Sequence, residues 1–264
     1  MANGSLLKYS ICLLLYYFMN SEDLQRRHYA QTASSYDTVL GVTPEHEFGL
    51  YLLLGILDAA KATSLLDVGA GTGRGLRFLM EHRPKLVVHG IEPVEELRIV
   101  AQEKGVPKEF ITAGGGYTLP FPDDSFDIVT EFGVLHHVET PALLVREMLR
   151  VARLGIYLSD TNNLGQGSVG GRVIKNLFYW FGFWKLFNYI RTKGKGSVFE
   201  STDGLWYYYT LFEHFPELAR HCHSVHVLNT RGTSRNHWFS ASHAAIFATK
   251  PAILNESPFF LHLR

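Results

Sequence analysis

The chain has little cysteine and no excess of either charge. Only Cys12 and Cys222 occur among its 264 residues, which excludes a disulfide framework and favours a reducing, cytoplasmic location. Lysine plus arginine and aspartate plus glutamate both total 25, so the chain lacks the overall basic character of nucleic-acid-binding proteins. It also has no Pro-Pro pair, which excludes the Asn/Asp-Pro-Pro-aromatic motif of enzymes that methylate nucleic-acid amino groups. We therefore expect no nucleic-acid partner.

The N-terminal apolar run is too short to cross a membrane. Leu6–Met19 is interrupted by Lys8 and Ser10, whereas a spanning helix needs about 20 residues. Its basic flank is thin and no Ala-x-Ala cleavage pattern follows, so a signal peptide is disfavoured. We expect residues 1–20 to pack on the rest of the chain as a helix, with a membrane-surface anchor formed by residues 1–19 as the alternative.

Metal-ligand spacing is also missing from the sequence. His221, Cys222 and His223 are ligand types, but alternate residues of a strand face opposite sides, and the chain has no second ligand pair. We therefore expect no metal site.

The chain has enough apolar residues to bury one large core. They make up 46% of the 264 residues, and the length suits a single α/β domain over residues 21–264. Short apolar runs alternate with helical patterns, which is typical of a doubly wound, mostly parallel sheet, here preceded by N-terminal helices. Seven strands are predicted, over residues 65–68, 86–91, 110–111, 127–129, 156–158, 225–228 and 244–249, the last two as a hairpin at the sheet edge.

A glycine-rich turn follows the first predicted strand. That strand ends in Asp67-Val68, and glycine then alternates through Gly69, Gly71 and Gly73 before an amphipathic segment. Glycine lets the backbone turn sharply and lets a ligand approach the main chain, while the helix start presents free N–H groups. The pattern predicts a cradle for a nucleotide-type cofactor. Its register lacks the third glycine of a dinucleotide fingerprint and the Gly-Lys-Ser/Thr of a P-loop.

Acidic residues come directly after other predicted strands. Glu92 lies 23 positions after Gly69, where a carboxylate can accept both hydroxyls of a ribose or simply cap the following helix. Glu131 and Asp160 follow the fourth and fifth strands. Because ligands of such sheets bind at the carboxyl ends of the strands, we expect these side chains to share one cleft.

The segments around these residues resemble the class I S-adenosylmethionine (SAM) methyltransferases. Asp67–Gly73 is similar to their first motif, and Leu-Pro-Phe-Pro-Asp-Asp-Ser-Phe-Asp-Ile-Val at 119–129 resembles a segment of the type 11 small-molecule members. Residues 133–138 and 146–151 continue the match in register. The resemblance implies the seven-stranded methyltransferase fold, SAM as cofactor, and a helical substrate lid over residues 161–220, inserted between strands five and six.

The resemblance also implies roles for individual residues. The glycine-rich turn would hold the methionine part of SAM, Glu92 the ribose and Val94 the adenine face, while Tyr36 would close over the methionine end. Glu131 would lie near the methionine amino group or cap its own turn. The set expected to bind the cofactor is Tyr36, Asp67, Gly69, Ala70, Gly71, Thr72, Gly73, Glu92, Pro93, Val94, Gly115, Gly116, Glu131 and Phe132.

The sequence departs from the family pattern at two places. Relatives usually carry an aspartate before the Leu-Pro-Phe segment, whereas residues 113–117 read Ala-Gly-Gly-Gly-Tyr here. The contact to the adenine amino group must therefore come from the backbone or be lost. The usual Lys-Pro-Gly-Gly turn before the fifth strand reads Ala-Arg-Leu-Gly at 152–155, which we expect only to shorten a turn.

Two adjacent histidines follow the fourth strand, close to where a transferred methyl group should lie. A hydroxyl acceptor must lose its proton, and histidine is the side chain best suited to remove it near neutral pH. We expect His137 to be this base, oriented by Asp160, with His136 as the second choice. The alternative that neither histidine acts as a base, one being a structural turn residue, stays open.

Residues 173–190 are aromatic and apolar with a helical pattern, and a loop rich in glycine and lysine follows them. This stretch is either ordinary core or the wall of an apolar acceptor pocket. Its cations are either a solvated face or a contact to anionic lipid head groups, so peripheral membrane contact through residues 173–195 is a further alternative. These cations are Lys175, Lys185, Arg191, Lys193 and Lys195.

From these patterns we expect a SAM-dependent methyltransferase that acts on a small-molecule acceptor, at a hydroxyl of a sugar-containing or partly apolar metabolite. The alternatives are a membrane-associated methyltransferase acting on a lipid or quinone carbon, and a non-catalytic SAM-binding protein. The sequence leaves the acceptor, the methylated atom and the oligomeric state open.

Overall fold

The computed structural model describes residues 21–39, 43–115, 117–231 and 236–251. The expectations for residues 1–20 and for Gly116 lie outside these ranges. The main helices are α2 (Ser21–Thr32), α3 (Tyr36–Val39), α4 (Pro44–Ala60), α5 (Arg74–His82), α6 (Glu95–Glu103), α7 (Pro141–Val151), α8 (Val169–Trp180), α9 (Trp184–Arg191), α10 (Phe215–His221) and α11 (His237–Ser240). The strands are β1 (Ser64–Val68), β2 (Val87–Ile91), β3 (Ile111–Thr112), β4 (Phe126–Phe132), β5 (Ala152–Thr161), β6 (Ser197–Glu200), β7 (Gly204–Tyr207), β8 (Ser224–Arg231) and β9 (His243–Thr249).

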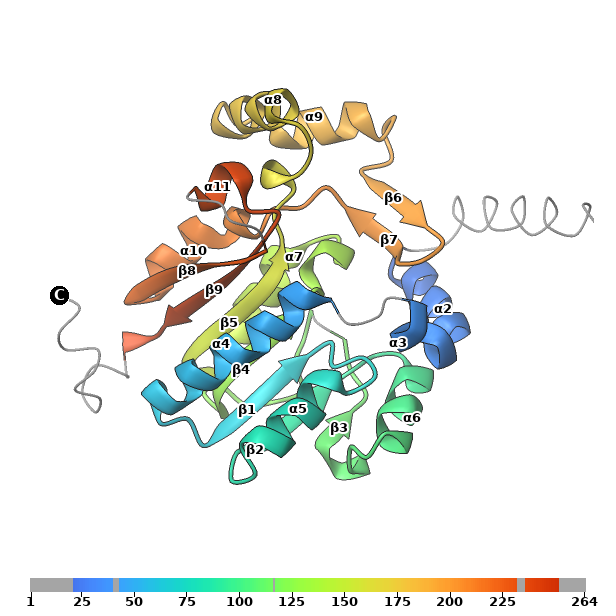
Figure 1. The fold of residues 1–264 in the computed structure, drawn as a ribbon, viewed down its shortest axis with the longest axis vertical. Helices are drawn as coiled ribbons and strands as arrows, with labels where there is room; N and C mark the ends of the chain where they lie inside the picture. Colours follow the sequence, from blue (N-terminus) through green and yellow to red (C-terminus); the bar gives the residue numbers. More distant parts are fainter. Residues whose placement is uncertain (1–20, 40–42, 116, 232–235, 252–264) are drawn as a thin grey trace, which may run out of the picture.

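Seven strands form one twisted sheet with helices on both faces (Figure 1). Their order is β3-β2-β1-β4-β5-β9-β8. The pairs from β3 to β5 are parallel, whereas β9 runs antiparallel to both β5 and β8. This is the mostly parallel, doubly wound sheet that the sequence predicts, including the C-terminal hairpin at its edge.

The central strands are apolar on both sides because both faces of the sheet are covered. Leu65 of β1 and Ile128 of β4 pack under α4 and α5, in a core that includes Leu53 and Leu76. Their chain neighbours, Leu66 and Val129, face the opposite side and pack with α7 and α10. Alternate strand residues point to opposite faces, so the continuous apolar runs of the sequence supply two separate cores.

The chain between β5 and β8 forms two further hairpins. Helices α8 and α9 lie at the top of Figure 1, and the two-stranded sheet β6–β7 lies beside α2 at its right. The predicted helical stretch at 173–190 is interrupted at Phe181–Phe183, where Gly182 adopts a φ of +76° that favours glycine. Among the described residues, no helix is both long and apolar enough to span a bilayer.

Candidate active site

A first cavity opens at the carboxyl ends of β1, β2 and β4. Of the three acidic residues expected to share one cleft, only Glu92 lines it, so that expectation is wrong for Glu131 and Asp160. The base of the cavity is the glycine-rich turn, its apolar wall comes from α6, β4 and α7, and its cover comes from α2. The lining residues are Ser21, Glu22, Gln25, Arg26, Tyr29, Tyr36, Val68, Gly69, Gly71, Ile91, Glu92, Pro93, Val94, Leu97, Gly114, Gly115, Tyr117, Phe132, Gly133, Val134, His137, Val138, Glu139 and Leu144.

The glycine-rich turn keeps the main chain accessible from this cavity. Gly69, Gly71 and Gly73 have φ angles of +73°, +55° and +71°, which favour glycine over residues with a side chain. A methyl group on Gly71 would meet no atom nearer than 3.9 Å, so the space beside this residue is open. A methyl group on Gly69 would instead overlap Val134, which fixes the β1 turn against the β4 turn.

Glu92 forms a buried carboxylate wall of the first cavity. Its Oε2 accepts a hydrogen bond from the Gly71 N–H (3.0 Å), and its Oε1 accepts from the Val94 N–H (2.9 Å). Burial raises the pKa of this carboxyl to about 7, against the effect of the two N–H donors. The carboxylate therefore joins the β2 end to the glycine-rich turn, and it both lines the cavity and caps the start of α6.

Two other acidic residues, Asp67 and Asp37, stabilise the glycine-rich turn from outside the cavity. Asp67 is buried and accepts a hydrogen bond from the Thr130 hydroxyl (3.0 Å), and burial raises its pKa to about 7. Asp37 of α3 accepts from the Thr72 hydroxyl (2.8 Å) and pairs with Lys104. Asp67 and Thr72 thus position the turn but do not line the cavity. Ala70 and Gly73, which were also expected to bind the cofactor, do not line it either.

Glu131 does not line the first cavity. It is fully buried, and its carboxylate accepts hydrogen bonds from the Val134 N–H (3.0 Å) and the Ser159 N–H (2.9 Å). Of the two roles expected from the sequence, the geometry matches the cap of its own turn. The neighbouring Phe132 does line the first cavity, as do Gly115, Pro93 and Val94.

Helix α2 covers the first cavity, which the sequence did not predict. Ser21, Gln25 and Tyr29 line the cavity from one face of this helix. Their spacing of four residues is typical of one helix face, so the pattern was readable, but nothing in it names a ligand. Tyr29 also contacts Tyr36 edge to face, with ring centroids 5.6 Å apart.

His137 connects three segments rather than pairing with Asp160. Its Nδ1 lies 2.6 Å from the Leu205 carbonyl of β7, which can only accept, and 3.2 Å from the Gln25 amide nitrogen, which can only donate. The shorter contact places the proton on Nδ1. His137 Nε2 therefore accepts from the Tyr29 hydroxyl of α2 (3.0 Å). The ring joins the β4 turn to α2 and β7, and both its nitrogens have partners.

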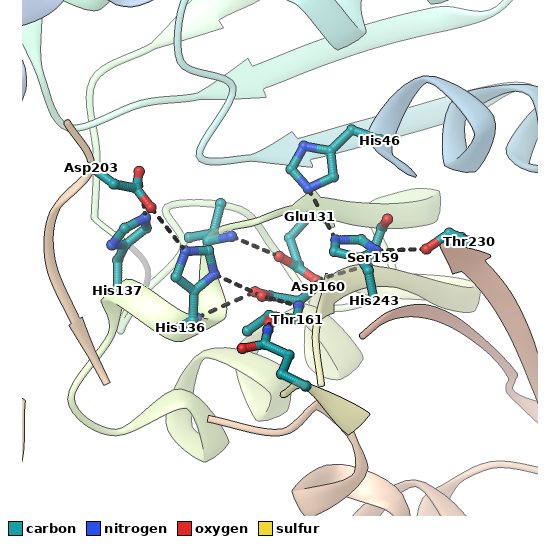
Figure 2. A network of polar contacts seen from close by, with 12 residues as sticks. His46, Glu131, His136, His137, Ser159, Asp160, Thr161, Asp203, Thr230 and His243 are labelled. Atoms are coloured by element: carbon teal, nitrogen blue, oxygen red, sulfur yellow. Dashed lines mark hydrogen bonds and ion pairs between the residues drawn. The ribbon is translucent and has the colours of Figure 1, made fainter. Parts of the chain in front are cut away.

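Asp160 pairs with His136, so the predicted pairing of His137 with Asp160 is wrong. The His136 Nδ1 lies 2.7 Å from Asp160 Oδ1, and the carboxylate also accepts from the His136 backbone N–H (3.3 Å) (Figure 2). The 3₁₀ turn Leu135–His137 places the two neighbouring rings side by side, with centroids 4.0 Å apart, so sequence adjacency could not decide which of them meets Asp160. Asp160 is fully buried, whereas the His136 side chain is 17% exposed.

Asp203 is a functional candidate that the sequence did not mark. It lies in the loop between β6 and β7, and its Oδ2 is 3.7 Å from His136 Nε2, while its Oδ1 is 3.5 Å from His137 Nε2 (Figure 2). Burial disfavours a charged imidazole, but the carboxylates of Asp160 and Asp203 outweigh it and raise the pKa of His136 to about 10. Burial alone would raise the pKa of Asp203, but the hydrogen bond with His136 outweighs it and holds this pKa well below its usual range.

The ligand atoms of His136, His137 and Asp203 all lie within 4.8 Å of one another, a separation that could admit a metal ion. The triplet His221-Cys222-His223 does not form such a group in the part of the chain that the structure describes. The potential ligands of the first group come from segments 66 residues apart, which is why no spacing rule found them.

A second, polar cavity of about 700 Å³ lies beside His136 and Asp160. It is bordered by α4, the β5 end, the loop before α8 and the β8–β9 edge. The lining residues are Tyr36, Thr43, Glu45, His46, Arg74, Phe132, Gly133, His136, His137, Asp160, Thr161, Gly165, Gln166, Gly167, Arg172, Asp203, Arg231, Ser240, Ser242 and His243.

A directional hydrogen-bond chain crosses one wall of the second cavity. The Arg74 guanidinium, which only donates, lies 3.3 Å from His46 Nδ1, so the opposite His46 Nε2 donates to His243 Nε2 (3.1 Å). His243 Nδ1 then donates to the Thr230 hydroxyl (2.6 Å). Burial lowers the pKa of His46 to about 4 and that of His243 to about 3, so both rings are neutral near pH 7.

The two cavities share four residues, Tyr36, Phe132, Gly133 and His137. The fold and these cavities define a class: a doubly wound α/β protein that holds a nucleoside-type cofactor at the switch point of its sheet, beside a second ligand site.

Residues 66–159 match the sequence model of a family described as the methyltransferase domain. Over that segment the chain is similar to the class I SAM-dependent methyltransferases. SAM is the cofactor of this class, and the residues around the first cavity fit it: Gly71 leaves open space beside the main chain, and the buried Glu92 presents a carboxylate. Glu92 would hold the ribose, and Val94 and Leu97 would face the adenine.

Individual relatives match only part of the chain. An uncharacterized methyltransferase of Schizosaccharomyces pombe is 33% identical over 150 residues, 52% of each chain. The demethylmenaquinone methyltransferase of Roseiflexus castenholzii is 33% identical over 136 residues, 49% of this chain and 56% of that protein. The crystal structure of YcgJ from Bacillus subtilis aligns with a TM-score of 0.48 and 20% identity, covering 78% of this chain and 99% of that one. The chain thus spans about half the length of the curated relatives it matches.

Proposed function

We propose that this protein is a SAM-dependent methyltransferase that methylates a hydroxyl of a polar, sugar-containing small molecule. The observation that carries the proposal is the meeting of the two cavities at Tyr36, Phe132, Gly133 and His137, with the His136–Asp160 pair in the wall of the second. Two ligands bound on either side of this junction are held close together, and proximity supplies much of the catalysis in a direct transfer.

We assign His136 as the base that removes the acceptor proton. Bound SAM supplies a methyl group on a positively charged sulfur, and the protein must align the acceptor and remove its proton. His136 lines the second cavity beside Asp203, with 3.7 Å between Nε2 and Oδ2, so an acceptor hydroxyl bound in that cavity can donate to Nε2. Neutral His136 takes the proton at Nε2, and the Asp160 carboxylate at Nδ1 stabilises the resulting imidazolium.

His137 takes a different role in this scheme. Its two nitrogens are already occupied by Leu205 and Tyr29, so it positions the cover of the first cavity rather than acting as a base.

The lining of the second cavity supports a polar acceptor. Hydroxyl, amide, carboxylate and guanidinium groups surround it, including Thr161, Gln166, Arg172 and Ser242. Such groups recognise a molecule that carries several hydroxyls, as a sugar does, because each buried polar group then finds a partner.

Methylation of a quinone carbon is the second candidate. It is favoured by the Roseiflexus relatives, which are named demethylmenaquinone methyltransferases. The second cavity here has few apolar residues to enclose a quinone ring, and we therefore rank this reaction below transfer to a polar hydroxyl.

The first experiment is calorimetric titration of the full chain with S-adenosylhomocysteine, the product form of the cofactor, with NAD as a comparison. We expect micromolar binding of S-adenosylhomocysteine and none of NAD. Gly71→Arg should abolish binding because its side chain would enter the open space beside the turn, and Glu92→Ala should weaken it about tenfold by removing the ribose acceptor.

Glu96→Ala is the matched control, since this glutamate is exposed on α6 and lines neither cavity. A chain that binds S-adenosylhomocysteine but methylates nothing in a panel of glycosides, phenols and quinones would instead be a non-catalytic SAM-binding protein. Absence of binding in the folded protein would overturn the proposal.

A further inference from the structure

The α8–α9 hairpin has its apolar side chains on the outside. Trp180, Phe181 and Ile190 are 72%, 71% and 67% exposed. On α8 the exposed residues recur every three or four positions and so share one face. The other large apolar side chains exposed on the hairpin are Val169, Val173, Ile174, Leu177, Phe178, Phe183, Leu186 and Tyr189.

Polar residues of the same hairpin point inward and fix it to the protein. The Lys175 ammonium is buried and donates to the carbonyls of Asn163 and Gln166. On α9, the Asn188 amide donates to the Tyr208 carbonyl (3.1 Å), and the Trp184 indole donates to Glu213 (2.9 Å). The hairpin is thus anchored through its polar side, and its apolar side faces away from the protein, the reverse of an ordinary surface helix.

The hairpin is also locally basic in a chain that has no net charge. Residues 169–196 contain six basic residues and no acidic one. Lys185, Arg191, Lys193 and Lys195 are exposed, in the first turn of α9, at its last residue and after its end. An apolar, aromatic face with cations at its border has the composition of a segment that lies in the interface of an anionic bilayer.

We propose that the α8–α9 hairpin docks this protein on the surface of a membrane that contains anionic lipids. The apolar face, with Trp180 and Phe181 at the turn of the hairpin, enters the head-group region, and the neighbouring cations contact lipid phosphates. The complementary charge is what favours a lipid surface over a second copy of this neutral chain.

Docking in this way brings the membrane close to the second cavity. Gln166, Gly167 and Arg172 line that cavity, and they lie directly before or within the first turn of α8. An acceptor with a polar head group and a membrane-embedded tail can then place its hydroxyls in the cavity without leaving the bilayer. This assignment of the acceptor class rests on the proposed function, whereas docking itself does not.

The test is co-sedimentation of the full chain with vesicles of phosphatidylcholine alone or with 30% phosphatidylglycerol, an anionic lipid of the kind that attracts polybasic segments. We expect binding to the anionic vesicles, weakened by 0.5 M salt and reduced at least tenfold in Trp180→Glu/Phe181→Glu. The matched control is Val87→Glu/Ile99→Glu, which changes two apolar side chains that are 62% and 46% exposed elsewhere. This control should bind as the unchanged chain does.

Each other outcome overturns the proposal. Binding that survives Trp180→Glu/Phe181→Glu but disappears when residues 1–19 are deleted would make the N-terminal run the anchor. A dimer in solution that this double variant dissociates, without vesicle binding by the unchanged chain, would make the face a contact between copies. S-adenosylhomocysteine titration of each variant shows that it is folded, and unchanged cofactor binding with lost vesicle binding separates docking from the proposed activity.

Discussion

At the scale of single residues, two adjacent histidines differ because their partners differ. Both rings lie near Asp203, but the Nδ1 of His136 meets the buried Asp160 carboxylate, whereas the Nδ1 of His137 meets the Leu205 carbonyl. Carboxylates stabilise the charged imidazole, so the pKa of His136 is raised to about 10. Near pH 7 most of the protein then carries the protonated form, which cannot accept a proton.

We therefore expect methyl transfer to become faster as pH rises. kcat/KM should increase from pH 7 towards pH 10, as the neutral form of His136 becomes populated. His136→Ala should lower kcat by about 100-fold or more and remove the pH dependence, with little change in S-adenosylhomocysteine affinity. His226→Ala, on β8 and lining neither cavity, is the control. Near-normal turnover of His136→Ala at saturating acceptor would rule out His136 as the base.

Removal of the Asp203 charge should move this pH profile in a known direction. Asp203 raises the pKa of His136, so Asp203→Asn should lower it and shift the midpoint of kcat/KM against pH to a lower value. The measurement is the pH–rate profile of both proteins with the same acceptor. A midpoint that stays in place would show that Asp203 acts on the rate by another route.

At the scale of elements, α2 and β7 close the first cavity by meeting on the ring of His137. The Tyr29 hydroxyl of α2 donates to Nε2, and Nδ1 donates to the Leu205 carbonyl of β7. Tyr29 and Leu205 lie 176 residues apart in the chain, but α2 and β7 lie side by side in the structure (Figure 1). The cover over the first cavity is therefore held from both ends of the chain.

Loosening this contact should weaken cofactor retention. Tyr29→Phe removes one hydrogen bond of about 1 kcal/mol, so we expect about fivefold weaker S-adenosylhomocysteine binding, seen mainly as faster dissociation. Tyr51→Phe on α4, 52% exposed, removes a phenol hydroxyl away from the cavities and should have no effect. Stopped-flow displacement measures the rate, and equal rates for Tyr29→Phe and the unchanged chain would contradict a covering role for α2.

Helices and strands were predictable where the residue pattern of the segment alone specifies them. The buried strands β1, β4 and β5 are short apolar runs, and each appears near its expected place. The β6–β7 hairpin was not predicted, because its aromatic residues alternate weakly and its pairing with α2 is a tertiary contact. Asp203 lies in the loop of that hairpin, so this site residue was missed for the same reason as the hairpin itself.

At the scale of the whole molecule, burial of acids couples folding to pH. Glu92 and Asp67 have pKa values of about 7 in the folded chain, above those of exposed carboxyls. The folded state therefore binds more protons than the unfolded state between about pH 4 and pH 7, and the free energy of unfolding falls as pH rises through this window.

Glu92→Gln should flatten this dependence because it replaces the titrating carboxyl with a neutral amide. Relative to the unchanged chain, the variant should gain up to about 3 kcal/mol of stability between pH 4.5 and pH 7. Urea unfolding at several pH values measures it. The raised pKa of His136 affects stability in a separate pH window. Protonated His136 stabilises the folded state fully below about pH 6.5, and this contribution is lost as pH rises towards 10. Parallel curves for the variant and the unchanged chain would refute the effect of Glu92.

The sequence by itself determined the sheet, the glycine-rich turn and the first cavity. These follow from local rules: apolar periodicity sets strands and helices, glycine sets the turn, and a parallel sheet gathers its carboxyl ends in one place. Gly71, Glu92 and Val94, which the sequence predicts to bind the cofactor, line this cavity.

Only the tertiary structure decided which histidine meets Asp160, that Asp203 joins them, and which side of the α8–α9 hairpin faces outward. The ring directions of His136 and His137 depend on one 3₁₀ turn, and Asp203 arrives from a segment 66 residues further along the chain. The hairpin sequence is apolar on one side and polar on the other, and either side could have been buried. The polar side is the buried one because Lys175 and Asn188 find hydrogen-bond partners there, the carbonyls of Gln166 and Tyr208. A buried polar group needs such partners, and only the tertiary structure brings them into place.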